Sequence, residues 1–121
     1  MKRNNTLSHK SMWEILVPTE RRLSPGKYYT TRYHRVWDSK VRNITGGLTI
    51  MTPARGQWVH PSTGKFFKER MIPVRIIATR EEIEKVIDLT LSYYDQLGIL
   101  CYKISDEVIL KVKEEDCHLI G

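Results

Sequence analysis

A long alternating segment that runs directly into a capped helix constrains the fold of this chain most strongly. Within residues 66–78, every second residue from Ile72 onward is apolar, so these side chains share one face of an extended strand. Thr79 and Glu82 have the capping-box spacing, in which a hydroxyl and a carboxylate satisfy free amides at a helix start. Apolar residues at three- and four-residue steps continue to Leu97, and Gly98 supplies the stop. We therefore predict a strand over 66–78 and a helix over 79–97.

The remaining elements are predicted from shorter patterns. A strand is expected at 12–17, a helix at 32–45 before Gly46-Gly47, strands at 48–52, 57–60, 99–104 and 107–112, and turns at 53–56 and 61–64. Pro73 interrupts the long strand, which predicts an edge position or a bulge there. The order strand, helix, strand, strand, helix, strand is the ferredoxin-like βαββαβ pattern. The predicted class is α+β, with two helices on one face of an antiparallel sheet.

The length of 121 residues fits one domain. Residues 1–11 are polar and unpatterned, which predicts a flexible tail ahead of a single domain over 12–121. No apolar run approaches the roughly 20 residues of a membrane span, and no secretion signal is recognisable, so we expect a cytoplasmic protein without membrane contacts. Cys101 and Cys117 are expected to be reduced thiols. Cys117-His118 has no further ligands at metal-binding spacing, so neither a metal nor a cofactor is expected.

The net charge of +6 is distributed unevenly along the chain. Residues 1–43 hold ten Lys or Arg against three Asp or Glu, and residues 44–78 hold five against one. Residues 79–121 reverse the balance, with five basic against ten acidic side chains. The basic part could bind an anionic nucleotide, polyphosphate or nucleic acid through its field. Equally, it could dock on the acidic part, within one chain or between copies.

No dinucleotide, P-loop, zincin or CxxC motif is present, and the four histidines are scattered. Glu69 stands out as the only carboxylate between Asp38 and Glu81. One interpretation is a structural ion pair with a neighbouring cation, which contributes little at a surface. The other follows from alternation, which places Glu69 on the sheet face away from the helices, beside Phe67 and Met71. A carboxylate there suggests a functional surface covered by another subunit.

The tyrosines form two clusters, one around Tyr28, Tyr29 and Tyr33 and one at Tyr93-Tyr94. They could stack on adenine or on single-stranded bases. The interpretation we favour is that Tyr94 and Trp37 pack in the core while Tyr28 and Tyr29 decorate a loop. A sheet that binds RNA would need cations between aromatics on its central strands, and residues 48–52 have none, which argues against nucleic acid as a partner.

Four stretches carry a resemblance to a known family: 13–17 (WEILV), 33–42 (beginning YHRV), 68–75 (KERMIPVR) and 94–103 (YDQ, leading into LCYK). Over about three-quarters of its length, the chain resembles the small S-adenosylmethionine (SAM) lyases of bacteriophages, the SAMase family. The resemblance implies a ferredoxin-like homotrimer with sites between subunits. It also implies cleavage of SAM to methylthioadenosine and homoserine lactone. A related lyase of CRISPR defence degrades the AMP conjugate of SAM, SAM-AMP, whose extra phosphate suits a basic chain.

The resemblance places the essential glutamate of the family on Glu69. We take Tyr94, Gln96, Arg70 and Trp58 as candidates for substrate binding, of which Trp58 lies outside the four stretches. The stretch at 94–96 departs from the family in Asp95, which is shorter than the usual glutamate. In this reaction the substrate's own carboxylate attacks its γ-carbon, so no outside nucleophile is required. Two alternatives stay open: a non-catalytic, nucleotide-binding oligomer that acts as a sensor or sponge, and a basic accessory protein that binds nucleic acid.

Overall fold

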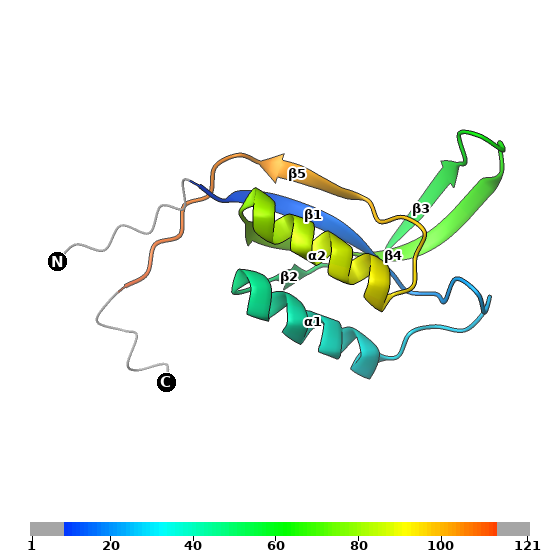
Figure 1. Cartoon of the computed structure of the whole chain (residues 1–121), viewed down its shortest axis with the longest axis horizontal. Helices are drawn as coiled ribbons and strands as arrows, with labels where there is room; N and C mark the ends of the chain where they lie inside the picture. The colour runs from blue at the N-terminus through cyan, green and yellow to red at the C-terminus, as the bar shows by residue number, and fades with distance from the viewer. Residues whose placement is uncertain (1–8, 114–121) are drawn as a thin grey trace.

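The computed structural model describes residues 9–113 of the chain, and its elements lie in two layers (Figure 1). The elements are β1 (Ser11–Pro18), α1 (Thr31–Thr45), β2 (Thr49–Ile50), β3 (Ala54–Val59), β4 (Phe66–Ala78), α2 (Arg80–Tyr93) and β5 (Cys101–Ser105). Both helices lie on one face of a five-stranded antiparallel sheet, and the other face has no described helix over it. The predicted α+β ferredoxin-like class is thus confirmed.

The sheet is built around β1 and β4. Its order is β2-β4-β1-β5, and β3 pairs with β4 as well. In the pairing of β1 with β4, Ile15 lies opposite Val74 and Trp13 opposite Ile76. These four side chains are buried and belong to the core beneath the helices. By alternation, odd-numbered β4 residues, including Glu69, point to the uncovered face, as predicted.

The first half of β4 extends beyond β1 as a hairpin with β3, seen at the upper right of Figure 1. The sequence prediction placed a turn at 53–56 and a strand from Gln57, and this was wrong: β3 begins at Ala54 and pairs with β4 from there. The strand predicted at 48–52 is shortened to β2. The β3 strand of the hairpin is therefore longer than the turn signals of the sequence indicate.

Pro73 lies where the partner of β4 changes from β2 to β3. Between the last pair with β2 and the first pair with β3, residues 51–53 lie opposite only Ile72 and Pro73. This extra residue is a bulge in the strand that runs beside Pro73, in agreement with the predicted irregularity. A proline is tolerated there because it has no amide to donate to a regular ladder.

The helices are held on the sheet by an apolar core and by buried polar contacts. The Trp37 side chain of α1 is 1% exposed, and its Nε1–H donates to the Thr90 hydroxyl of α2 at 3.0 Å. Helix α1 ends at Thr45 with Gly46 in a left-handed conformation, as the glycine pair predicted. Helix α2 begins with the predicted capping box of Thr79 and Glu82.

Helix α2 ends at Tyr93, four residues before the predicted end at Leu97, which is 84% exposed. The hydroxyls of two tyrosines, one in the loop before α1 and one in α1 itself, explain why α2 ends early. Tyr33 donates a hydrogen bond to the carbonyl of Tyr93, and Tyr29 donates one to the carbonyl of Tyr94. Because these carbonyls have partners outside the helix, the chain can leave it, and Asp95 adopts a positive φ of 49°.

Two further sequence predictions meet different outcomes. The strand predicted at 107–112 is not formed, whereas the one at 99–104 is confirmed as β5 with a shifted start. The expected tail at 1–11 lies largely outside the described residues, and its last residue, Ser11, begins β1. Cys117-His118 also lies outside them. Cys101 is a free thiol whose pKa is raised to about 11 by burial.

Candidate functional site

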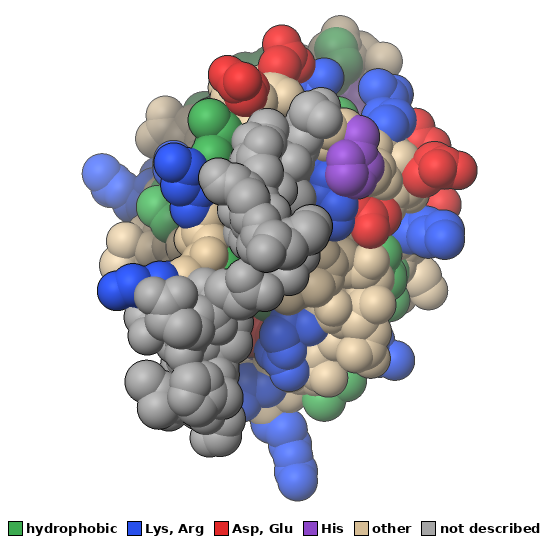
Figure 2. All heavy atoms as spheres, turned by 90° about the vertical axis from the view of Figure 1, so that its left-hand side faces the viewer, with side chains coloured by type: hydrophobic (Ala, Val, Ile, Leu, Met, Phe, Trp, Pro, Cys, Tyr) green, Lys and Arg blue, Asp and Glu red, His purple; other side chains and the backbone are tan. Residues whose placement is uncertain are grey.

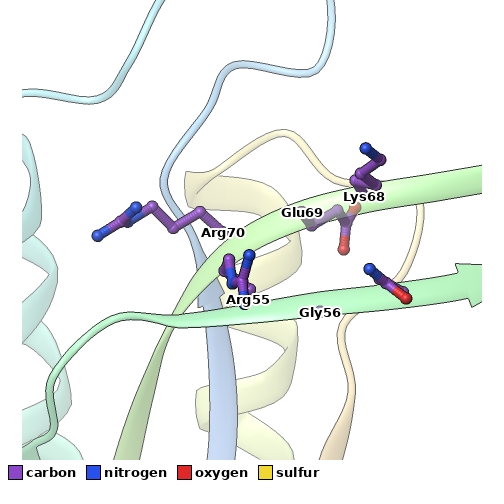
Figure 3. Close-up of a pocket in the computed structure, with 6 residues that line it drawn as sticks. Arg55, Gly56, Lys68, Glu69 and Arg70 are labelled. Carbon is purple, nitrogen blue, oxygen red and sulfur yellow. The ribbon is translucent and has the colours of Figure 1, made fainter.

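A cavity of about 280 Å³ runs along the projecting hairpin (Figure 3). Its lining comes from three consecutive residues of β3 and three of β4, namely Arg55, Gly56, Gln57, Lys68, Glu69 and Arg70. The strand register pairs them one to one, with each β3 residue directly opposite one on β4. The cavity is therefore a product of strand pairing, because its two halves are separated in sequence by the hairpin turn.

Glu69 and Gly56 face each other across this hairpin. Glu69 is exposed, and its carboxylate makes no hydrogen bond or ion pair with any other residue of the described range. In Figure 3 this carboxylate turns toward β3, whereas the Lys68 amine turns away. A Cβ on Gly56 would lie 2.2 Å from the terminal methyl of Met71. The space over Gly56 is therefore occupied by the end of the Met71 side chain, which a larger residue at position 56 would displace.

Two of the predicted binding residues lie on the same hairpin as Glu69. Arg70 lines the cavity, opposite Arg55. Trp58 is not among the lining residues, but it lies two residues from Gly56 and stacks on Phe67, with ring centroids 4.6 Å apart. Its side chain is 42% exposed, so it offers an aromatic surface next to the site.

The other two, Tyr94 and Gln96, lie at the C-terminal end of α2 and do not line this cavity. Tyr94 is fully buried, and burial raises the pKa of its hydroxyl. The side chain of Gln96 donates to the Tyr94 carbonyl at 3.2 Å. Direct contact between Tyr94 and a substrate does not fit this burial, because the ring has no free surface. The interpretation of Tyr94 and Trp37 as core residues is confirmed instead.

The tyrosines predicted as two clusters form one stack between the N-terminal end of α1 and the C-terminal end of α2. Tyr33 stacks on Tyr29 and Tyr93 with centroids 5.0 and 4.2 Å apart. The Arg21 guanidinium lies 4.5 Å from the centroid of the Tyr29 ring. Tyr29 is only 8% exposed, so its prediction as loop decoration was wrong, whereas Tyr28 is 61% exposed as expected.

His34 of α1 joins this aromatic group through a polar contact. Its Nδ1 lies 2.6 Å from the Tyr94 hydroxyl. It also lines a small cavity of about 50 Å³ with Asp38 from the next turn of α1. Burial lowers the pKa of His34 and raises that of Asp38. Nothing in the sequence pairs His34 with Tyr94, which lies 60 residues away.

A second carboxylate lies on the uncovered sheet face. Glu14 of β1 accepts a hydrogen bond from the Tyr102 hydroxyl of β5 and pairs with Arg75 of β4 at 3.0 Å. The Tyr102 hydrogen bond and the Arg75 guanidinium together hold the pKa of Glu14 below its usual value, against the effect of burial. Glu14 is therefore a satisfied carboxylate that stabilises the sheet, in contrast to Glu69.

Sequence reasoning missed Arg55, Gly56, Gln57 and Lys68 as lining residues. The segment 53–56 was interpreted as a turn, so Arg55 and Gly56 were never placed opposite Arg70 and Glu69. The signal that could have found them is the short connection at 60–65, since a tight hairpin turn there predicts paired strands of similar length on both sides.

Solved structures of other proteins have the same arrangement of elements. Phage SAM lyase shares this fold. In complex with S-methyl-5'-thioadenosine it aligns with a TM-score of 0.62 and 13% identity over 87% of this chain and 88% of its own. In the apo state the values are 0.55 and 14%, over 93% and 92%. The divalent cation tolerance protein of Thermus thermophilus aligns at 0.59 with 9% identity, over 88% and 89%.

At these identities the likeness concerns the fold alone. No protein-family profile matches the chain, and no curated protein matches it. Among residues 9–113 no group of three or more His, Cys, Asp or Glu side chains is arranged to hold a metal ion. Within the same residues, no helix combines the length and apolar character needed to cross a membrane.

Proposed function

We propose that this protein is a lyase that cleaves SAM, or its AMP conjugate SAM-AMP, with Glu69 as the critical side chain. The observation that carries the proposal is the state of Glu69: an exposed carboxylate without a partner in the described range, which lines the cavity of the hairpin. Its backbone belongs to a fold shared with phage SAM lyase. Glu69 has no described structural partner to explain it, and it lies where a cationic substrate group could bind.

The proposed reaction is intramolecular. A carboxylate oxygen of the substrate forms a bond to its own γ-carbon, and the bond from that carbon to the sulfonium sulfur breaks, with the electron pair going to sulfur. The products are homoserine lactone and the neutral thioether methylthioadenosine, or its AMP conjugate. Because opposite charges cancel along this path, the site has to hold the substrate in a bent shape and exclude water.

Within this scheme Glu69 binds the ammonium group or the ribose hydroxyls of the substrate. Trp58 offers the adenine ring an exposed aromatic surface on the same hairpin. Gln96 and Tyr94, which do not line the cavity, shape the end of α2 in this scheme and do not contact the substrate. No side chain is required to act as a nucleophile.

We further propose that the active form is a homotrimer, with sites between subunits. The uncovered face of the sheet supports this, since both helices lie on the other face (Figure 1). The hairpin also extends beyond β1, so its cavity has one open side that a second copy could close. Light scattering coupled to size exclusion tests the assembly, and a monomer that retains turnover would contradict it.

The lyase is tested by incubating the purified full chain separately with SAM and with SAM-AMP and following both by liquid chromatography and mass spectrometry. Methylthioadenosine or its conjugate should appear together with homoserine lactone. Glu69→Gln should lower turnover by about 100-fold or more, because a charge that positions the substrate is lost. Its stability should stay within about 0.5 kcal/mol, since the carboxylate has no described partner.

Glu84→Gln is the matched control, because Glu84 is an exposed glutamate on α2 with only a surface pair to Arg80. It should leave turnover unchanged. A Glu69→Gln variant as active as wild type would remove Glu69 from the mechanism. Ligand recovered intact but bound would instead support a nucleotide-binding sensor or sponge, which the basic cavity lining favours on its own.

A further inference from the structure

We infer that the hairpin face opposite to Glu69 is a phosphate-binding subsite formed by Arg55, Lys68 and Arg70. The register places Arg55 directly opposite Arg70 and Gln57 directly opposite Lys68. Directly opposite residues of an antiparallel pair share one face, with Cβ atoms about 4.5–5.5 Å apart. Three cations and one amide therefore share the same small surface, which lines the main cavity.

This clustering of positive charges destabilises the protein when no ligand is bound. Like charges directly opposite each other in a sheet repel. Glu69 is the only acid of the hairpin, and its side chain projects from the other face of β4, as its position relative to Lys68 in Figure 3 shows. Within the described part of the chain, none of the three cationic side chains forms an ion pair or hydrogen bond. Their repulsion is therefore uncompensated unless an anion binds.

Several cations elsewhere in the described residues have acidic partners within 3.5 Å, namely Lys10, Arg22, Arg75, Arg80 and Lys103. Figure 2, which views the left-hand side of Figure 1, away from the hairpin, shows acidic and basic side chains on the same surface. The hairpin differs because two of its unpaired cations, Arg55 and Arg70, lie directly opposite each other on neighbouring strands. The net charge of +6 alone does not explain this local arrangement.

The chemistry of the cluster suits phosphate oxygens. Two guanidinium groups present planar sets of donors that match phosphate, a lysine adds a point charge, and the Gln57 amide adds a neutral donor. A volume of about 280 Å³ is near the lower end for small-molecule sites, so the occupant we favour is a phosphate group on a small nucleotide. A polynucleotide would need a longer track of cations.

If the proposed lyase function holds, this subsite identifies the preferred substrate as SAM carrying a further phosphate, as in the AMP conjugate. That assignment rests on the proposed function, whereas phosphate binding itself does not. Arg55 and Lys68 would then act as specificity-determining residues together with Arg70. Glu69 lines the same cavity and would hold the sulfonium-bearing part, so the substrate would have to pass around the free edge of β3, which pairs only with β4.

The test uses the full chain and two probes, AMP and adenosine, in calorimetric titrations. AMP should bind at least tenfold more tightly than adenosine. Arg55→Gln and Arg70→Gln should each remove most of this preference and leave adenosine binding unchanged. Each variant should have a Tm equal to or above that of wild type, because a repulsion is relieved. Arg80→Gln, on α2 and paired with Glu84, is the matched control and should bind AMP as wild type does.

Turnover assays separate this inference from the proposed lyase. AMP binding that depends on Arg55 and Arg70, in a protein that cleaves neither SAM nor SAM-AMP, would keep the subsite and refute the lyase. Equal turnover of SAM and SAM-AMP, unaffected by either arginine variant, would keep the lyase and overturn the assignment of the phosphate-bearing substrate. Equal affinity for AMP and adenosine would overturn the phosphate subsite. It would also be overturned if single-stranded RNA displaced labelled AMP at a lower concentration than unlabelled AMP does.

Discussion

The contact between Trp37 and Thr90 permits a prediction whose size can be worked out from the structure. Trp37 of α1 is 1% exposed and Thr90 of α2 is 0% exposed, and the indole N–H donates to the threonine hydroxyl at 3.0 Å. Thr90→Val keeps the side-chain shape but removes the acceptor. A buried donor left without a partner costs about 1–3 kcal/mol. The variant should be destabilised by that amount.

The corresponding change in thermal stability follows from the size of the chain. Unfolding entropy is about 2.1 cal/mol/K per residue, so about 1–3 kcal/mol corresponds to a Tm lower by about 4–12 °C for a chain of 121 residues. Circular dichroism melts measure the shift, and urea unfolding gives the free energy at 25 °C. The matched control is Thr31→Val, an exposed threonine in the first turn of α1, which should change stability by no more than about 0.5 kcal/mol. A Thr90→Val variant as stable as the control would refute the argument that this hydrogen bond joins the two helices.

Two further predictions concern the hairpin and the histidine. Gly56→Val should lower SAM or SAM-AMP turnover by about tenfold or more, because the new side chain would displace the end of Met71 beside Glu69. Tm should move by only a few degrees, since the end of a methionine side chain is flexible, and turnover equal to wild type would show that the packing of Met71 on Gly56 does not affect the site. Burial lowers the pKa of His34 below its usual 6.5, so the unfolded chain takes up a proton more readily than the folded one. Stability from this group is present above pH 6.5 and is lost as the pH falls from 6.5 toward the lowered value. Melts between about pH 7.5 and 5.5 should show a larger Tm decrease for wild type than for His34→Gln, and parallel curves would contradict this.

The candidate site was only partly predictable from sequence. Glu69 is recognisable as a lone acid among cations, and Arg70 follows it in a stretch that carries the family resemblance. Arg55 could not be found, because Pro53 and Gly56 are typical of a turn, whereas here β3 has already begun at Ala54. Glycine in a strand marks close approach of a neighbour, and that neighbour, Met71, is known only once the two strands are paired.

The end of α2 shows the same limit. Apolar residues continue at helical spacing to Leu97, and Gly98 is an ordinary stop signal, so local information predicts a longer helix. The observed end depends on the hydroxyls of Tyr29 and Tyr33, which donate to the carbonyls at the end of the helix. Those tyrosines lie 65 and 60 residues away from these carbonyls in sequence, so no local pattern could have shown this competition.

What the sequence alone determined is the order of the main elements and the inner faces of β4 and the helices. Periodicity and caps depend on residues within a turn or a strand of one another, and β4, α1 and the start of α2 follow from them. Only the tertiary structure decided which side chains meet across strands and between helices. Arg55 opposite Arg70, Gly56 opposite Glu69 and Trp37 against Thr90 are all consequences of register and packing. A shift of one residue in register would turn every hairpin side chain to the other face, which is why a cavity built from paired strands cannot be seen before the strands are paired.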